Sequence, residues 1–500
     1  LTTIQRDLYI DSLLKADTRH QCLGGHIDIH QSLNIDVWQS ASQQLVVDYA
    51  PYRSQLIVGG LHSIEPAYLC VHANLAVKWE VIEWPDDDDS LVEIIHETVY
   101  EPYDLTCEMP FRALLVKLSE THYRAVIASH HLISDGVSGA LFLSKLGEYY
   151  QCALSGEPWP EMQGDPFAYS QYHRQHFDVS DTHLFWQEQL AQVKPLSLPA
   201  PFTQAVMETQ VETFTASEWK AIRRFSRAQS ISPAILFKAL FSYALAHWQR
   251  PEHDFMFFDI VDNRTADWRE TVGCFFQQVP IVIPLDYMSA SADVADFLSY
   301  LRHYYKEVGH CKDISIRAQQ HICDPGAVKV YFNYYHFPAK VTFLGQKERI
   351  EQYPPQVEPE QLYCVVNAGK QIPELRLYGD TSILNGYPLL LHMTDLLKQL
   401  MAGVNRFSQF NVWLEHEQNI VSTMNHTEYQ YELSGMVPEC ILRQIQHHKH
   451  SVALIENGEK ITYQMLEAQA CQVARRLQLQ GVQANDVILL HMQRSAYRVS

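Results

Sequence analysis

The segment His130-His131-Leu132-Ile133-Ser134-Asp135-Gly136 joins two stretches of different periodicity. Before it, residues 123–129 form a mostly apolar run that is typical of a buried strand. The Asp-Gly pair is typical of a tight turn directly before a helix. After it, apolar residues recur at helical spacing, at Leu141, Phe142, Leu146 and Tyr149. We therefore expect a strand, a turn and a helix, with two histidines where the strand ends.

The histidine pair allows two interpretations. An imidazole has its ordinary pKa near neutral pH, and a helix N-terminus beside it offers backbone N–H donors to a polarised or anionic group, so the pair can be catalytic. A histidine pair at a strand end can also be a polar cap or a stray metal site. The exact string favours catalysis, because it matches HHxxxDG and so resembles the condensation domains of nonribosomal peptide synthetases and related acyltransferases.

Further segments resemble the same family, in its order, over residues 1 to 424. Leu1-Thr2-Thr3-Ile4-Gln5-Arg6 resembles its S/T-x-x-Q opening, and residues 48–54 stand in place of its RHExLRT motif, where only Arg53 is clearly kept. Residues 167–190 resemble its hinge segment and YWxxxL helix. Residues 259–264 and 272–280 resemble its ANR and GxFxNTxP motifs. This serial order makes an accidental match of the short motif improbable.

The resemblance implies a reaction between two substrates tethered to carrier proteins through 4'-phosphopantetheine. The amine of an aminoacyl acceptor would attack an acyl or peptidyl thioester donor, and His131 would act as general base or as a hydrogen-bonding positioner for that amine. Gly136 would give the turn its freedom and donate its N–H to the developing oxyanion. His130 would turn into the lobe, because neighbouring residues that leave a strand point to opposite sides.

Asp135 and Arg53 are expected to have a structural role. Asp135 could orient a catalytic histidine, but a carboxylate in a tight turn is better placed to bond local backbone and a distant cation, and the resemblance suggests Arg53 as that cation. The chain is expected to hold no metal and no cofactor of its own. Candidates for the substrate channel are Ser138, Asn263, Arg264 and Gln277.

Some subtypes of the family fit the sequence less well than others. Cyclising relatives carry Asp in place of the histidines, and epimerisation domains follow a carrier rather than precede an adenylation domain, so both are disfavoured. A starter-type domain that transfers a fatty or aryl acyl group, an ester-forming domain, and a non-catalytic platform that recruits carriers remain open. Departures from the pattern at residues 48–50, at Val137 and at Gln277 leave the donor, the acceptor and their stereochemistry unassigned.

A second resemblance begins near residue 425. Gly458-Glu459-Lys460-Ile461-Thr462-Tyr463-Gln464-Met465-Leu466 resembles the G-x-x-(L/I)-T-Y-x-x-L opening of adenylation domains. A helix ending at Gly481 and a buried strand over residues 486–490 are expected after it. The Gly-rich phosphate loop of such domains is absent from these 500 residues. We expect no ATP–pyrophosphate exchange from this chain, with the remainder of an adenylation domain as its partner.

These resemblances predict an α/β fold. Two chloramphenicol-acetyltransferase-like lobes would form a V around a substrate tunnel, followed by a partial adenylation subdomain. The predicted limits are residues 1–160 for the first lobe, 161–424 for the second, 425–457 for a linker and 458–500 for the truncated start of the adenylation domain. The strongest local signals in the second lobe are the cap Ser232-Pro233 of a long helix and three strands near residues 254–260, 281–283 and 328–334.

Composition agrees with a large enzyme. The 500 residues are 47% hydrophobic and can bury more than one core. A formal charge of −20 argues against nucleic acid as a partner, and no apolar run is long enough to predict a membrane span. Ten scattered cysteines without a C-x-x-C pair indicate reduced thiols in a cytoplasmic protein. Upstream donor and downstream acceptor carrier proteins are the expected partners.

Overall fold

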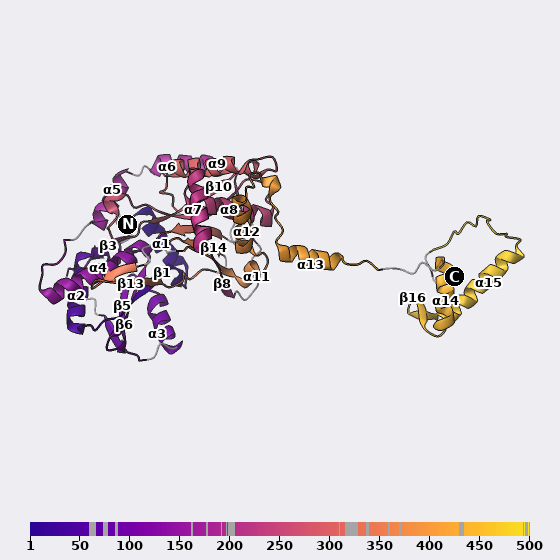
Figure 1. Ribbon diagram of the computed structural model, residues 1–500, viewed down its shortest axis with the longest axis horizontal. Helices are drawn as coiled ribbons and strands as arrows, with labels where there is room; N and C mark the ends of the chain where they lie inside the picture. Colours follow the sequence, from indigo (N-terminus) through magenta and orange to yellow (C-terminus); the bar gives the residue numbers. More distant parts are fainter. Residues whose placement is uncertain are drawn as a thin grey trace. The chain divides into compact units, whose positions relative to one another are not determined.

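The motif turn connects β6 (His122–His130) to α4 (Gly136–Ser155) in the computed structural model of the chain (Figure 1). The predicted strand, turn and helix are therefore confirmed. Asp135 is the N-cap of α4, because its side chain accepts a hydrogen bond from the Ser138 N–H at 2.9 Å. A helix start leaves such backbone donors without an intrahelical partner, so this residue fixes where the helix begins.

The chain forms two compact units, Leu1–Leu414 and Glu415–Ser500. Among the helices that the structure describes, none combines the length and apolarity needed to cross a membrane. The structure describes residues 1–59, 67–73, 79–85, 89–161, 164–176, 179–191, 193–196, 198, 206–309, 311–315, 329–336, 340–358, 361–369, 372–429, 435–493, 495 and 499.

The first sheet of the larger unit carries the motif. Its six strands lie in the order β12-β13-β1-β6-β5-β4, and only β4 and β5 pair in parallel. Together with its helices it forms what we call the first lobe, in which α2 and α4 pack side by side (Figure 1). The remaining elements of this lobe are α1 (Thr3–Leu14), β1 (Cys22–Ile29), α2 (Ile35–Asp48), β2 (Ser54–Val58), β3 (Ala67–Val71), β4 (Glu80–Glu83), α3 (Asp89–Tyr100) and β5 (Phe111–Ser119).

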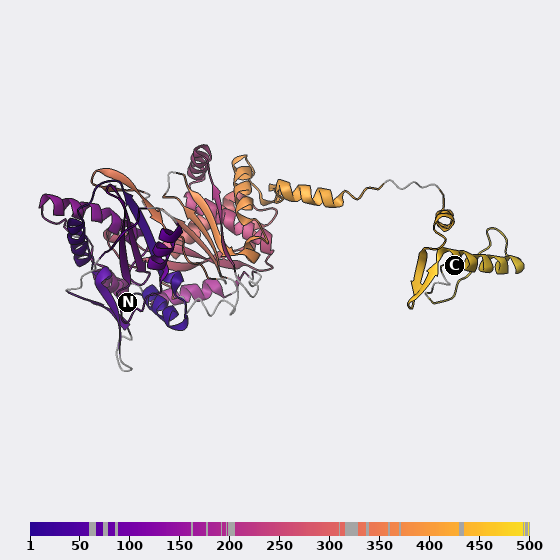
Figure 2. The ribbon, with the colours of Figure 1, turned by 90° about the horizontal axis from the view of Figure 1, so that it is seen from below.

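Two strands of the first sheet come from much later in the chain. β12 (Lys340–Phe343) and β13 (Gln346–Gln352) form a hairpin, and β13 pairs antiparallel with β1. In Figures 1 and 2 they appear in orange beside the indigo and violet strands. Phe343 and Ile350 are buried in the core of the first lobe. The predicted limits of the two lobes, residues 1–160 and 161–424, stay a prediction. β12 and β13 lie beyond residue 160 and yet belong to the first sheet, because the periodicity of a strand does not indicate which sheet it joins.

The second sheet and its helices form the second lobe. Its main path is β10-β9-β11-β14-β15-β8, and β7 pairs with β9. The predicted cap is confirmed, since the Ser232 side chain accepts from the Ile235 N–H, and the three predicted strands are β9, β10 and β11. Its elements are α5 (Pro166–His176), α6 (Val179–Leu190), β7 (Lys194–Pro195), β8 (Met207–Thr213), α7 (Ala216–Ala228), α8 (Pro233–Gln249), β9 (Phe255–Asp262), β10 (Phe276–Ile283), α9 (Val294–Val308), β11 (Lys329–Tyr335), β14 (Gln361–Asn367), β15 (Glu374–Asp380), α11 (Thr381–Leu384) and α12 (Leu389–Met401).

The two faces of the second sheet have different surroundings. On β14, Leu362 and Cys364 are fully buried in the core beneath the helices, whereas Tyr363 and Val365 face a cavity. Successive side chains of a strand alternate between faces, so one face builds the core and the other is free to form a substrate wall. The helices α7, α8, α9 and α12 all contribute to that core.

The smaller unit contains α13 (Glu415–Asn425), α14 (Val437–His447), a hairpin of β16 (Val452–Glu456) and β17 (Glu459–Thr462), and α15 (Tyr463–Leu479). Gly481 follows α15 with a positive φ of 85°, which confirms the predicted glycine at the helix end. The predicted buried strand at 486–490 is wrong: these residues are in no strand, and Val487 is 98% exposed. A strand needs a neighbour to satisfy its backbone, and β16 and β17 pair only with each other among the described residues.

Candidate active site

His131 lies on the wall of a cavity of about 510 Å³ that both lobes line. The first lobe contributes Ile127 of β6 and Gly136 at the start of α4, and the second contributes Asn333 and Tyr363 from its open sheet face. A cavity of this size is in the range of sites that hold small molecules. The second histidine of the motif therefore belongs to a site that could hold substrate.

Backbone hydrogen bonds hold the motif turn against the N-terminal segment. The His131 N–H donates to the Gln21 carbonyl at 2.8 Å, and the Gln5 side chain donates to the Leu132 carbonyl at 2.8 Å. Gln5 in turn accepts from the Thr2 N–H at 2.9 Å, which caps α1. The family-like opening segment thus has a physical purpose, since its glutamine ties the first helix to the turn that presents His131.

Burial controls the protonation of His131. Removal from water lowers its pKa to about 4, against the nearby charge of Asp135 and the backbone at Ser134, both of which favour the protonated ring. The ring packs against Phe276 of β10, with 4.6 Å between ring centroids. The imidazole is therefore neutral at physiological pH, and a neutral ring has one nitrogen that can accept a hydrogen bond.

His130 is turned into the first lobe. It is 1% exposed, and its Nδ1 accepts a hydrogen bond from the Leu132 N–H at 3.0 Å. Burial, together with the neighbouring His131, lowers its pKa to about 3. Its ring stands at right angles to that of Tyr103, 6.1 Å away. These contacts are those of a neutral core residue.

Asp135 is the centre of a buried ion pair that joins the two lobes. Its carboxylate accepts from the Arg264 Nη1 at 2.6 Å and Nη2 at 2.9 Å, and also from the Phe275 N–H at 3.1 Å. The side chains of Asp135 and Arg264 are 7% and 5% exposed. Burial by itself would raise the pKa of Asp135, but the Arg264 charge and these hydrogen bonds outweigh it and lower the pKa below its ordinary value.

Ser138 extends this junction. Its Oγ accepts from the Gly273 N–H at 3.0 Å and from the Arg264 Nη2 at 2.8 Å, so the first turn of α4 is tied to the segment before β10. The Arg264 guanidinium also stacks over the Phe275 ring, 4.2 Å from its centroid. The start of α4 is thereby held by residues that are distant in sequence and belong to the second lobe.

The expected ion pair between Arg53 and Asp135 is wrong. Arg53 donates to the Val47 carbonyl at 3.0 Å and to the His72 carbonyl at 2.8 Å, while Arg264 occupies the place beside Asp135. Arg53 ends a 3-10 turn that leads into β2, where carbonyls at the end of α2 and after β3 are within its reach. Arg53 therefore braces loops of the first lobe.

Three of the four predicted channel residues do not line the cavity, and Arg264 does. Ser138 is fully buried in the junction described above. Asn263 donates its N–H to the Phe275 carbonyl at 2.9 Å. Gln277 is 1% exposed and donates to the Ile314 carbonyl at 2.7 Å. For Gln277 the reason is strand alternation, because its neighbour Gln278 on β10 lines the cavity and successive side chains of a strand point to opposite faces.

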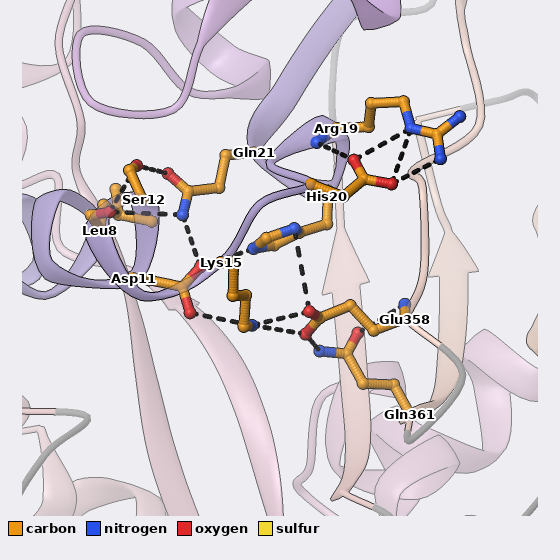
Figure 3. A network of polar contacts seen from close by, with 10 residues as sticks. Leu8, Asp11, Ser12, Lys15, Arg19, His20, Gln21, Glu358 and Gln361 are labelled. Carbon is orange, nitrogen blue, oxygen red and sulfur yellow. Dashed lines mark hydrogen bonds and ion pairs between the residues drawn. The ribbon is translucent and has the colours of Figure 1, made fainter. Parts of the chain in front are cut away.

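A second interlobe network lies at the rim of the cavity (Figure 3). Lys15, the C-cap of α1, bridges Asp11 at 2.8 Å and Glu358 at 2.7 Å, and His20 contacts the same Asp11 at 2.7 Å. Asp11 also accepts from the Gln21 side chain at 2.6 Å. Since the Gln21 carbonyl holds the His131 N–H, this rim network connects α1, the motif turn and the segment before β14.

Glu358→Gln is expected to reduce the free energy of unfolding of unit 1 by about 1 kcal/mol at low salt, and by less at high salt. The change removes a charge that Lys15 and Gln361 both contact, in a partly buried setting. Urea unfolding at two salt concentrations measures it. Asp17→Asn is the matched control, because the Asp17 side chain, which pairs with Arg19, is 56% exposed. Equal losses in both variants would contradict a role for the rim network in stability.

The comparisons with known proteins agree with this geometry. A family model described as the condensation domain matches residues 1–319, and one described as AMP-binding enzyme matches residues 441–499. The first match covers more than half of the chain. The chain therefore belongs to the condensation domain family, and a fragment of the AMP-binding family follows in its second unit.

Its curated relatives are nonribosomal peptide synthetases. Gramicidin S synthase 2 of Aneurinibacillus migulanus is 21% identical over 456 aligned residues, which cover 85% of this chain and 10% of that protein. The beauvericin nonribosomal cyclodepsipeptide synthetase of Beauveria bassiana is 29% identical over 188 residues, or 35% of this chain and 6% of that protein. The chain thus spans a small part of the length of the relatives it matches.

Solved structures confirm the two-lobed α/β fold. The first condensation domain of the calcium-dependent antibiotic synthetase, in complex with a substrate analogue, superposes with a TM-score of 0.68 at 16% identity, covering 83% of this chain and 98% of that one. The starter condensation domain of rhizomide synthetase with C8-CoA superposes with a TM-score of 0.67 at 14% identity, covering 82% of this chain and 96% of that one. A four-domain nonribosomal peptide synthetase bound to AMP and glycine superposes with a TM-score of 0.76 at 14% identity, covering 96% of this chain and 39% of that one.

Proposed function

We propose that unit 1 joins a carrier-bound acyl or peptidyl thioester to the amine of a carrier-bound aminoacyl group and forms an amide. One observation carries this proposal: the HHxxxDG turn presents a neutral His131 and the first residue of α4 to a single cavity between two lobes. The family supports it, since condensation domains belong to nonribosomal peptide synthetases.

The reaction needs few groups from the protein. The amine nitrogen bonds to the thioester carbonyl carbon, the C–S bond breaks, and the proton lost by the nitrogen ends on the departing thiolate. A histidine whose pKa is about 4 is a weak base, so we assign His131 to accepting a hydrogen bond from the attacking amine and aligning it. Alignment of two tethered reactants can account for much of the rate, because it replaces a bimolecular encounter.

Gly136 is assigned to the thioester carbonyl. It is the first helical residue of α4 and lines the cavity, and an N–H at that position has no carbonyl partner inside the helix. The helix N-terminus also carries partial positive charge, which stabilises an oxygen that gains negative charge. The Asp135–Arg264 pair would keep this donor in place by fixing the start of α4.

The partners in this proposal are an upstream donor carrier, a downstream acceptor carrier and the rest of an adenylation domain. The substrates would arrive on phosphopantetheine arms, and the chain would bind no cofactor itself. Intact-mass measurement of an acceptor carrier after incubation with different donor thioesters tests the proposal. A mass gain equal to the donor acyl group on an aminoacyl carrier supports it; a gain only on a hydroxyacyl carrier indicates ester formation, and no gain with any donor indicates a recruiting platform.

On the acid side of the pH–rate profile, the logarithm of the rate should rise with pH with a slope of one. The slope should not become steeper near pH 6.5. With a folded pKa of about 4, His131 stays neutral over this range, so only the acceptor ammonium, ordinarily at about 8, must lose a proton. Initial rates between about pH 5 and 9 with saturating carriers measure this. A histidine with an ordinary pKa would add a second proton and a slope of two below about pH 6.5, which would contradict the neutral ring.

A further inference from the structure

The cavity face of the second sheet carries a carboxylate at the end of β9. Asp262 is the last residue of this strand, its side chain is 51% exposed, and it lines the cavity. It stands at the alanine position of the ANR motif that this segment resembles. The motif therefore does not account for an acid here, and its reason has to be sought in the surroundings.

Asp262 lies beside the residue on which His131 packs. In the antiparallel pair of β9 and β10 it is directly opposite Phe276, so the two side chains share the cavity face, with Cβ atoms about 5 Å apart. The His131 ring contacts the same Phe276, with 4.6 Å between ring centroids. The carboxylate is thus close to any substrate whose amine is hydrogen-bonded to His131.

One oxygen of this carboxylate is free to bind a ligand. The Arg264 N–H donates to Oδ1 at 2.9 Å, but the guanidinium is 3.4 Å from that oxygen and is held by Asp135 at 2.6 and 2.9 Å. Lys312 contacts the main-chain carbonyl of Asp262, at 3.4 Å. Among the described residues, none donates a hydrogen bond to Oδ2 of Asp262. This oxygen therefore keeps its full capacity as an acceptor.

The charge of Asp262 is only partly stabilised by the protein. Withdrawal of the carboxyl from bulk water raises its pKa, and although Arg264 lowers it, the neighbouring Asp135 raises it further, so that the pKa lies above its ordinary value. A cation beside Oδ2 would stabilise the ionised form. A carboxylate with such a pKa on a cavity wall is typical of a site that binds a ligand.

The rest of this sheet face favours a cation over an anion. Among the described residues of the second sheet that line the cavity, Arg376 of β15 is the other charged one, and Glu374 already pairs with it at 2.7 Å. Asn333 and Tyr363 are neutral and hydrogen-bond each other at 2.8 Å. The charge with unused bonding capacity on this face is therefore negative.

We propose that Asp262 is a specificity-determining residue, which selects an acceptor whose side chain ends in an amine or a guanidinium. The assignment rests on the proposed function and specifies the aminoacyl group as basic. With its α-amine at His131, the acceptor's side chain starts one carbon away from the nitrogen. A lysine-like chain is long enough to cross the Phe276 ring and donate from its terminal N–H groups to Oδ2 of Asp262.

Binding of inert acceptor analogues tests this assignment without turnover. The probes are aminoacyl amides of aminopantetheine, in which an amide replaces the thioester, so they cannot donate their acyl group. Lysyl and norleucyl probes differ only by the terminal ammonium, and a glutamyl probe reverses the charge. Isothermal titration into the full chain should show the lysyl probe binding about tenfold more tightly than the norleucyl probe, with the glutamyl probe the weakest.

Asp262→Asn should remove this preference. The lysyl probe should lose about tenfold in affinity, the norleucyl probe should change by less than about twofold, and Asp262→Ala, which restores the residue of the motif, should behave in the same way. In the wild type, high salt should weaken the preference, because it screens the ion pair. Both variants should melt like the wild type, since the side chain is half exposed.

Asp267→Asn is the matched control, because Asp267 is exposed, lies in the same segment and does not line the cavity. It removes the same charge, so its lysyl preference should equal that of the wild type. Equal wild-type affinity for the lysyl and norleucyl probes, an equal loss of both in Asp262→Asn, the same loss in Asp267→Asn, or no binding of any probe would overturn the assignment.

These measurements separate the role of Asp262 from the proposed function. His131→Ala removes the partner of the α-amine alone, so it should keep the preference for the lysyl over the norleucyl probe. If the preference behaves as expected while no acyl group is ever transferred to an acceptor carrier, the role of Asp262 stands and the condensation proposal fails. If transfer occurs but lysyl and norleucyl acceptors have the same KM in the wild type, the role of Asp262 alone is wrong.

Discussion

Arg264→Ala is expected to lower the free energy of unfolding of unit 1 by about 3–5 kcal/mol, the typical result of removing one partner from a buried ion pair. It would leave the Asp135 carboxylate, in a residue only 5% exposed, without the two guanidinium hydrogen bonds that offset its burial. Asp135→Ala should destabilise to a similar extent, because it strands the guanidinium. Urea unfolding followed by tryptophan fluorescence measures both losses.

Arg53→Ala is the matched control for this prediction. Arg53 bonds two carbonyls, so its loss should cost about 1 kcal/mol. The double variant Asp135→Ala/Arg264→Ala should be destabilised by less than the sum of the single variants, since neither charge is then stranded. An Arg53→Ala variant that loses as much stability as Arg264→Ala would contradict the pairing seen here.

The same pair makes a contribution to stability that depends on pH. The folded-state pKa of Asp135 is lowered, so the unfolded chain binds this proton more readily. The contribution is therefore present above the unfolded pKa of about 3.9 and is lost as the pH falls through the folded value. In Arg264→Ala the free energy of unfolding should decrease less steeply as the pH falls, because Arg264 no longer lowers the pKa of Asp135.

The local structure at the motif could be predicted from sequence because it depends on neighbouring residues. The apolar run of β6, the cap Asp135 and the helical periodicity of α4 lie within one continuous segment. The same holds for the Ser232 cap of α8. In each case, the signal is a spacing of two or of 3.6 residues that short-range sterics and hydrogen bonding enforce.

The partner of Asp135 could not be predicted in the same way. Both Arg53 and Arg264 stand in motif-like segments far from Asp135 in sequence, and only the packing of the second lobe decides which guanidinium reaches it. A signal was available in retrospect, because Arg264 closely follows the strand β9 and Phe275 precedes β10, and the two strands pair in register. That pairing brings both residues to the same end of these two strands.

The rim network gave no sequence signal at all. Lys15 and Glu358 are 343 residues apart, and each looks like an ordinary surface charge. The sequence also did not indicate that β12 and β13 join the first sheet, because a strand has the same two-residue periodicity whichever sheet it joins. The predicted strand at 486–490 failed for the opposite reason, since apolar content predicts a strand but does not supply its neighbour.

His131→Ala is expected to reduce the rate of product formation on the acceptor carrier by about 10²–10⁴-fold. The methyl group that remains cannot accept a hydrogen bond from the amine, so the two tethered reactants lose their alignment. The effect should fall on kcat, while the KM for each carrier protein stays within about twofold, because the ring lines the cavity and contacts Phe276. Intact-mass kinetics with loaded donor and acceptor carriers measures both quantities.

His336→Ala provides the comparison that gives this result its meaning. His336 lines the same cavity but is exposed and directly follows β11, so its loss should leave kcat within about twofold. His131→Asn, which keeps an acceptor oxygen near the same place, should recover part of the lost rate if the ring positions the amine, and none if the ring must take a full proton. Product at the wild-type rate from His131→Ala, or equal losses in His131→Ala and His336→Ala, would show that the catalytic residue has been misassigned.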